Sequence, residues 1–258
     1  MTATSSGTFS PMPGAAPLPR QVLAQAGMEA RLMLRNGEQL LLAVVIPAIV
    51  LVGGVKGADR IGLDFSHPPV DVITPGVLAL AIMSTAFTSL AIATGFERRY
   101  GVIKRLGTSP LSRTGLLAGK IGALLLVEVL QVAVISGVGL ALGWEPDVDV
   151  VGTVLAVVFG TAAFAALGLA LAGSLRAEAT LAAANLVYLL LMAGGAVVLP
   201  TSAYGDFGEV VRWLPSGALG NAMRGALTDA TVVWRELAVL LAWAIGGAVL
   251  TARTFKWE

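Results

Sequence analysis

Residues 97–120 form the most chemically distinctive stretch of this sequence, because basic and apolar side chains alternate along it. The apolar positions are Val102, Ile103 and Leu106, and the basic positions are Arg98, Arg99, Lys104 and Arg105. On a short helix the two sets fall on different faces. Gly107 and Pro110 are expected to end that helix, and Ser112 can cap the next one.

A surface that combines cations with apolar side chains suits docking into a groove with an acidic rim on another protein. The alternative is that these cations only follow the usual excess of lysine and arginine on the inner side of a membrane.

Glu128 is the single ionisable residue deep inside one of the long apolar runs. A charged side chain at the centre of a bilayer costs about 2.5–3.5 kcal/mol on insertion scales, so such residues usually face a cavity or a partner. Glu128 is therefore a candidate contact for a cationic or polar substrate. The alternative is a protonated or hydrogen-bonded packing residue.

Other kinds of chemistry lack the residues that they need. The stretch from Gly115 to Lys120 is the nearest approach to a phosphate-binding loop, but its spacing is wrong and no hydroxyl follows the lysine. One histidine, His67, and no cysteine leave no HExxH or thiolate metal site. We expect no catalytic site, no metal and no bound cofactor. The net charge of +1 indicates no nucleic-acid partner.

The elements that must position these residues are long and apolar. The chain is 56% hydrophobic and only 13% charged, whereas soluble domains carry about 25% charged residues. Runs near the roughly 20 residues that cross a bilayer lie at about 39–55, 72–96, 121–144, 150–175, 179–200 and 237–255. Unpaired backbone groups are not tolerated in lipid, so each run must be helical. The fold class predicted is all-α integral membrane, with six transmembrane helices.

Lysine and arginine placement predicts the orientation. With the N-terminus inside, the inner segments hold twelve of these residues and the outer segments hold five. Both termini are therefore expected in the cytoplasm. Residues 1–19 are small, polar and proline-dotted, and we expect a disordered tail that is not a cleaved signal peptide. Residues 20–258 are expected to form one transmembrane domain.

Two amphipathic segments are too short to span. Residues 20–38 predict a helix on the inner membrane surface, or else a cytoplasmic extension of the first span. Residues 201–228 carry two apolar stripes that Pro215 separates, one with Phe207, Val210 and Leu214, the other with Leu219, Met223 and Leu227. The pattern favours a re-entrant helical hairpin in the outer leaflet. An external loop with two surface helices is the alternative.

The order of residues in 97–120 closely resembles the cytoplasmic loop of type-2 ATP-binding-cassette (ABC) export permeases, including the daunorubicin-resistance type. The matching positions are Glu97, Arg98, Gly101, Leu106, Ser109, Pro110, Leu111, Leu116, Gly119 and Lys120. Farther on, Leu199-Pro200, Trp213-Leu214-Pro215 and Arg224 resemble the segment between the fifth and sixth spans of that family. Tyr100 and Ile103-Lys104 depart from it, because many relatives carry acidic or polar residues there.

The resemblance implies that residues 97–120 contain a coupling helix that docks on a separate ATPase subunit. The implied docking residues are Glu97, Arg98, Arg99, Val102, Ile103, Lys104, Arg105, Leu106 and Pro110. Residues 201–228 would form an outer gate with Phe207, Trp213, Pro215 and Arg224. The substrate path would run between two permease chains along the second and fifth spans, with Glu128, Asn185 and Tyr188 as its polar groups.

The expected function is that of a permease subunit that exports hydrophobic or amphipathic compounds, such as drugs or lipids, across the bacterial cytoplasmic membrane. Its partners would be two ATPase subunits, which bind ATP and Mg²⁺, and a second permease chain, most simply a homodimer. A secondary multidrug carrier and a non-transporting membrane assembly protein are the alternatives.

Overall fold

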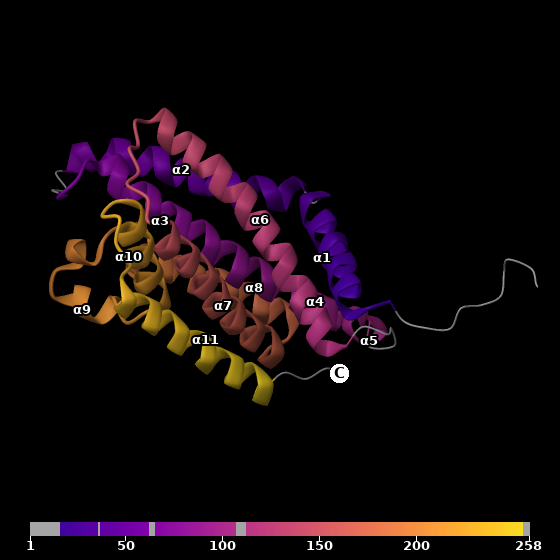
Figure 1. The fold of residues 1–258 in the computed structure, drawn as a ribbon. Helices are drawn as coiled ribbons and strands as arrows, with labels where there is room; N and C mark the ends of the chain where they lie inside the picture. Colours follow the sequence, from indigo (N-terminus) through magenta and orange to yellow (C-terminus); the bar gives the residue numbers. More distant parts are fainter. Residues whose placement is uncertain (1–15, 36, 62–64, 107–111, 255–258) are drawn as a thin grey trace, which may run out of the picture.

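The computed structural model describes residues 16–35, 37–61, 65–106 and 112–254, and within these residues every regular element is a helix. Figure 1 shows the helices arranged as an elongated bundle. Its elements in chain order are α1 (Leu18–Arg35), α2 (Gly37–Ile61), α3 (Pro69–Met83), the π-helical segment η1 (Ser84–Ser89), α4 (Leu90–Arg99), α5 (Val102–Leu106), α6 (Arg113–Ala141), α7 (Val150–Ser174), α8 (Ala177–Gly194), the 3₁₀ segment η2 (Thr201–Phe207), α9 (Gly208–Val211), α10 (Pro215–Leu227) and α11 (Trp234–Thr254).

Five helical stretches of the described residues are long and apolar enough to cross a membrane. They are Pro69–Arg99, Thr114–Ala141, Val150–Ser174, Ala177–Gly194 and Trp234–Thr254, and Ala43–Ala58 is a shorter apolar stretch within α2. The chain is thus an all-helical, multi-pass membrane protein. The count of six spans and the inward position of both termini stay predictions.

The second predicted span corresponds to α3, η1 and α4, which follow one another without a break. Pro69 opens this helix at a position where its missing N–H costs nothing. Nearly all of α3 is buried, because α2, α6, α7 and α10 surround it. α3 therefore forms the centre of the bundle.

The uninterrupted apolar run predicts a fifth span over residues 179–200, but the helix α8 ends at Gly194. Beyond it the backbone turns, and Ala196 has a φ of 53°. The carbonyl oxygens of Ala196, Val197 and Val198 all accept hydrogen bonds from the guanidinium of Arg224. A side chain far along the sequence thus satisfies the backbone groups that a longer helix would have paired internally.

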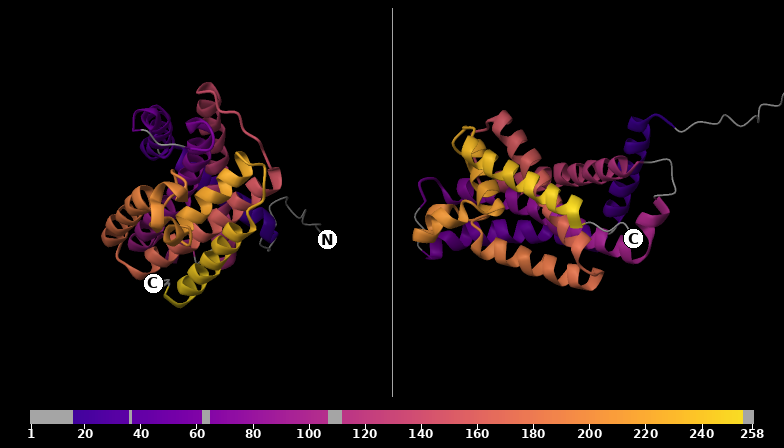
Figure 2. Two further views of the ribbon diagram at one scale, coloured as in Figure 1. Left: turned by 90° about the vertical axis from the view of Figure 1, so that its left-hand side faces the viewer. Right: turned by 90° about the horizontal axis from the view of Figure 1, so that it is seen from below.

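The N-terminal helix α1 crosses the end of the bundle, as the right-hand view in Figure 2 shows, and packs against α6. Gly119 and Gly122 of α6 permit this close approach, because a Cβ on either would press against Gln25 or Ala26. Ser112 caps α6 as the sequence predicted, and its hydroxyl accepts a hydrogen bond of 3.1 Å from the Gly115 N–H. α1 and α6 therefore meet where residues 97–120 end.

α10 is packed inside the bundle, against α3, α7 and α11, so it is not a surface helix. Pro215, which separates the two predicted apolar stripes, is its first residue, and Leu219 and Met223 are fully buried. Its other side is also buried, because Gly217 and Gly220 allow the backbone at Val211 and Val197 to approach closely. The re-entrant path of residues 201–228 through a membrane stays a prediction.

Candidate docking, substrate and gate residues

A buried charge cluster closes the base of the predicted docking loop. The Nζ atom of Lys120 lies 2.7 Å from Glu97 Oε1 and 3.1 Å from Glu29 Oε1. Gln25 donates a further hydrogen bond of 2.9 Å to Glu29. The Lys120 side chain is only 6% exposed. The first and last residues of the loop are thus joined to each other and to α1, which the sequence alone did not indicate.

Arg98 and Arg99 extend from α4 toward the connection between α7 and α8. Arg98 donates hydrogen bonds to the carbonyl oxygens of Ala172 and Leu175, at the C-terminal end of α7. Arg99 forms an ion pair with Glu178 in the first turn of α8. Glu97, Arg98 and Arg99 therefore have structural contacts within the chain, and their role in docking stays a prediction.

The short helix α5 carries the exposed part of the predicted docking surface. The side chains of Val102, Lys104 and Arg105 are exposed. Ile103 and Leu106 also belong to α5, and the structure does not describe their side chains. Pro110 lies outside the described residues. Exposed cations beside an apolar residue match the chemistry that the sequence predicted for docking.

Glu128 lies at the contact between α6 and α7 and is 1% exposed. Its Oε2 atom accepts a hydrogen bond of 2.7 Å from the hydroxyl of Thr161. Among the residues that the structure describes, its Oε1 atom has no hydrogen-bond partner. This oxygen is itself buried, so one acceptor of the carboxyl group stays unsatisfied among the described residues.

The other two substrate-path candidates belong to a different contact. Tyr188 of α8 is half-buried and shares a hydrogen bond with Ser84, at the start of the π-helical segment η1. Asn185, one turn earlier, is exposed. α8 packs against η1 and α4, so the second and fifth predicted spans are neighbours in the structure.

The π-helical segment η1 also contacts α6. Thr85 donates a hydrogen bond of 2.8 Å to Gln131, and Gln131 donates one of 2.9 Å to the carbonyl oxygen of Ala43 in α2. All three residues are buried. π-helical turns are often found at functional sites. Because η1 contacts α8 through Ser84 and α6 through Thr85, it connects the two regions that hold the substrate-path candidates.

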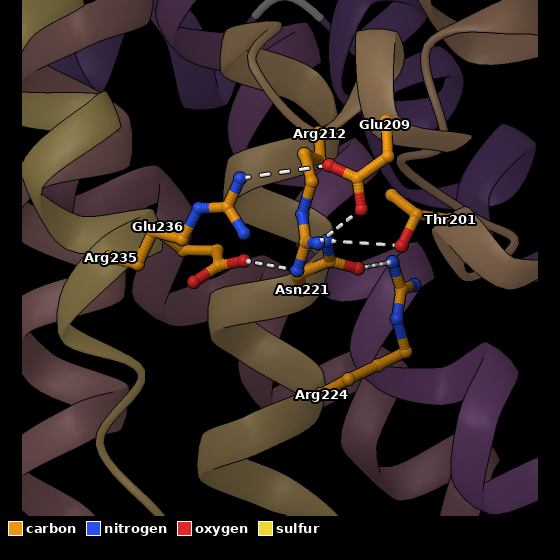
Figure 3. A network of polar contacts seen from close by, with 7 residues as sticks. All are labelled: Thr201, Glu209, Arg212, Asn221, Arg224, Arg235 and Glu236. Carbon is orange, nitrogen blue, oxygen red and sulfur yellow. Dashed lines mark hydrogen bonds and ion pairs between the residues drawn. The ribbon is translucent and has the colours of Figure 1, made fainter. Parts of the chain in front are cut away.

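At the opposite end of the bundle a polar network surrounds the predicted gate, as Figure 3 shows. Arg224 is fully buried and donates to Asn221 Oδ1 at 2.9 Å in addition to the three carbonyl oxygens after α8. Burial lowers the pKa of Arg224 to about 10, which leaves the guanidinium protonated at neutral pH. Arg224 therefore holds the turn after α8 against α10.

A second arginine in this network joins α9 to α11. Arg212 lies 2.9 Å from Glu209 and 3.4 Å from the buried Glu236 (Figure 3). Trp213 stacks under the guanidinium of Arg235 at 4.9 Å, and its carbonyl oxygen accepts a hydrogen bond from the indole N–H of Trp243. This hydrogen bond pairs the indole N–H of Trp243, which lies inside the last predicted span.

The four gate candidates are not equivalent in exposure. Phe207 and Trp213 are exposed, whereas Pro215 and Arg224 are buried in the bundle. The first two can contact lipid, solute or another chain, and the last two stabilise the fold. Of the residues in this network, the sequence singled out only Arg224 and Trp213. Their partners lie up to 30 residues away in the chain, so no local pattern indicated them.

Among the described residues no three histidine, aspartate or glutamate side chains lie close enough together to hold a metal ion. Comparison with known families gives a match to the model described as ABC-2 family transporter protein, over residues 69–253. The match runs from α3 into α11 and covers more than half of the chain. No curated protein matches the chain.

Proposed function

Since this chain belongs to the ABC-2 transporter family, we propose that it is the membrane-spanning permease subunit of an ABC exporter in a bacterial cytoplasmic membrane. A separate ATPase subunit, which binds ATP and Mg²⁺, supplies the energy. The working unit contains two permease chains and two ATPase subunits, with a homodimer of this chain at its centre. The cargo is hydrophobic or amphipathic, such as a drug or a lipid.

The observation that carries this proposal is the attachment of α5 to the bundle. α5 presents Lys104 and Arg105 on its exposed surface, and α4 leads into it directly. At the base of the loop, Lys120 joins Glu97 of α4 to Glu29 of α1. A partner that pushes on α5 would therefore move α4, α6 and α1 together, because buried ion pairs resist separation.

Co-purification tests the proposal. The tagged full chain is expressed with a candidate ABC ATPase subunit from the same genome, and retention of the ATPase is measured. The double variant Lys104→Glu, Arg105→Glu is expected to reduce retention about tenfold or more, because reversed charges repel an acidic groove. Arg253→Glu is the matched control, since Arg253 is an exposed cation at the end of α11.

ATP-dependent export then separates the proposal from its alternatives. Proteoliposomes that contain the permease and the ATPase should accumulate a hydrophobic dye only when ATP is present. Accumulation driven by an ion gradient without the ATPase would support a secondary carrier. Failure of any ATPase to bind, with no transport of any kind, would support a membrane assembly protein.

A further inference from the structure

A polar cleft of about 410 Å³ lies where α4 ends and the chain passes from α7 into α8. It is lined by Gly95, Arg98, Arg99, Leu175, Arg176, Ala177 and Glu178. Three of these residues are arginines and Glu178 is the one acidic member, so the lining has a net charge of +2. A cleft with this excess of guanidinium groups is suited to an anion, and to a phosphate in particular.

The cleft lies at the level where three membrane-crossing stretches end. Pro69–Arg99 and Val150–Ser174 finish beside it, and Ala177–Gly194 begins there. The polar headgroup region of a bilayer lies directly outside the hydrocarbon core that such stretches cross. The phosphate groups of membrane lipids are therefore the anions that lie nearest to this cleft.

The three arginines differ in how firmly the chain holds them. Arg98 is anchored, because its Nη1 atom donates to two carbonyl oxygens at the C-terminal end of α7. Arg99 pairs with Glu178, but the two side chains are 50% and 62% exposed. Exposed ion pairs contribute little stability, so Arg99 can exchange Glu178 for another anion. Arg176 is exposed and belongs to no ion pair among the described residues.

An apolar surface continues from the cleft along α8. Leu175 lines the cleft and is exposed, and Leu181 is exposed as well. Leu181 follows Ala177 by four residues, so both lie on the same face of α8. A lipid whose phosphate occupies the cleft would therefore have its acyl chain beside this face. A soluble phosphate compound would gain nothing from it.

We propose that this cleft binds the phosphate group of an anionic phospholipid, with Arg99 and Arg176 as its donors and an acyl chain along α8. The planar guanidinium can donate two parallel hydrogen bonds to a phosphate. Basic pockets between transmembrane helices at the cytoplasmic surface are typical sites for lipid headgroups. The lipid is a bound ligand of the permease, so this inference goes beyond the proposed function and depends on neither the cargo nor an ATPase.

Native mass spectrometry of the full chain in an uncharged detergent tests the inference, because it resolves individual bound lipids. Phosphatidylglycerol, which is anionic, and phosphatidylcholine, which has no net charge, are titrated with the same acyl chains. The wild type is expected to bind the first phosphatidylglycerol about tenfold or more tightly than phosphatidylcholine. The reason is that each cation near a membrane surface strengthens the attraction for an anionic lipid roughly fivefold.

Variants locate the interaction. Arg99→Gln and Arg176→Gln should each weaken the binding of phosphatidylglycerol about fivefold, and the double variant should bind the two lipids about equally. Arg253→Gln is the matched control, since Arg253 is an exposed cation at the end of α11 and is not part of the lining. Glu178→Gln should strengthen the binding of phosphatidylglycerol about fivefold, because it removes the acidic member of the lining. A general loss of folding cannot produce this gain.

Three results would overturn the inference. Equal binding of the two lipids by the wild type would remove charge from recognition. An unchanged preference in the double variant would place the lipid elsewhere on the chain. Displacement of phosphatidylglycerol by an equal concentration of glycerol 3-phosphate would show that the cleft takes a soluble phosphate. Each result is obtained without an ATPase and without transport, so failure here is distinct from failure of the proposed function.

Discussion

The charge cluster at Lys120 allows a sharp test of how the docking loop is attached. Lys120→Met keeps a long, unbranched side chain with good helix propensity, and it removes only the ammonium group. Glu97 and Glu29, whose side chains are 19% and 14% exposed, then lose the cation that lies within 3.1 Å of each. Gln25 still donates one hydrogen bond to Glu29.

Removing one partner of a buried ion pair costs about 3–5 kcal/mol. The lower end of that range applies here, because both carboxylates keep some access to water. For a domain of this size, a loss of about 3 kcal/mol in the free energy of unfolding corresponds to a fall in Tm of roughly 6–12 °C. Glu97→Gln should cause a smaller fall, since Lys120 retains Glu29 at 3.1 Å.

Thermal unfolding in detergent measures this, with intrinsic tryptophan fluorescence as the signal. Trp144 is buried and should respond to loss of packing. The double variant Lys120→Met, Glu97→Gln completes a cycle, and we expect it to be more stable than the sum of the single effects, because it leaves fewer unpaired charges. A Tm for Lys120→Met equal to that of the wild type, together with additive single effects, would refute a structural role for the cluster.

Two further predictions concern the opposite end of the bundle. Gly220→Ala should lower the Tm, because the new Cβ would lie 2.6 Å from the Val197 carbonyl oxygen. Gly246→Ala is the matched control, since a Cβ at Gly246 meets nothing within 4 Å. A lower Tm for Gly246→Ala than for Gly220→Ala would contradict this reasoning. Arg224→Gln should also lower the Tm, because buried carbonyl oxygens lose their donors, and the free energy of unfolding should fall by about 2 kcal/mol or more. If Arg224→Lys restored the wild-type Tm, a positive charge alone would suffice and the planar guanidinium would not be needed.

Composition and the lengths of the apolar runs were sufficient to predict a helical membrane protein. The same holds for some local features, since Ser112 caps α6 as expected and Pro215, which separates the two predicted apolar stripes, lies at the start of α10. Each depends on residues a few positions apart, and such short-range preferences can be recognised in a sequence. The resemblance of residues 97–120 also agreed with the family match that covers residues 69–253.

The partners of the charged residues could not be predicted in the same way. The docking role of Glu97 stays a prediction, but the structure shows that its carboxylate pairs with Lys120. Lys120 also pairs with Glu29, which precedes Glu97 by 68 residues in the chain. The gate role of Arg224 stays a prediction, and the sequence did not indicate that its guanidinium pairs with the backbone carbonyl oxygens after α8. These contacts join segments that are far apart in the sequence. The periodicity of apolar residues does not indicate which partner each buried charged side chain has.

The sequence by itself determined that the chain crosses a membrane in helices, because too few charged residues were present to cover a soluble surface. It also marked Glu128 as an unusual residue, since a carboxyl in an apolar run has a high cost in lipid. Only the tertiary structure decided where that carboxyl lies, buried between α6 and α7 with the hydroxyl of Thr161 as its hydrogen-bond donor. That position depends on how α6 packs against α7, and the packing of two helices cannot be read from either run of residues alone.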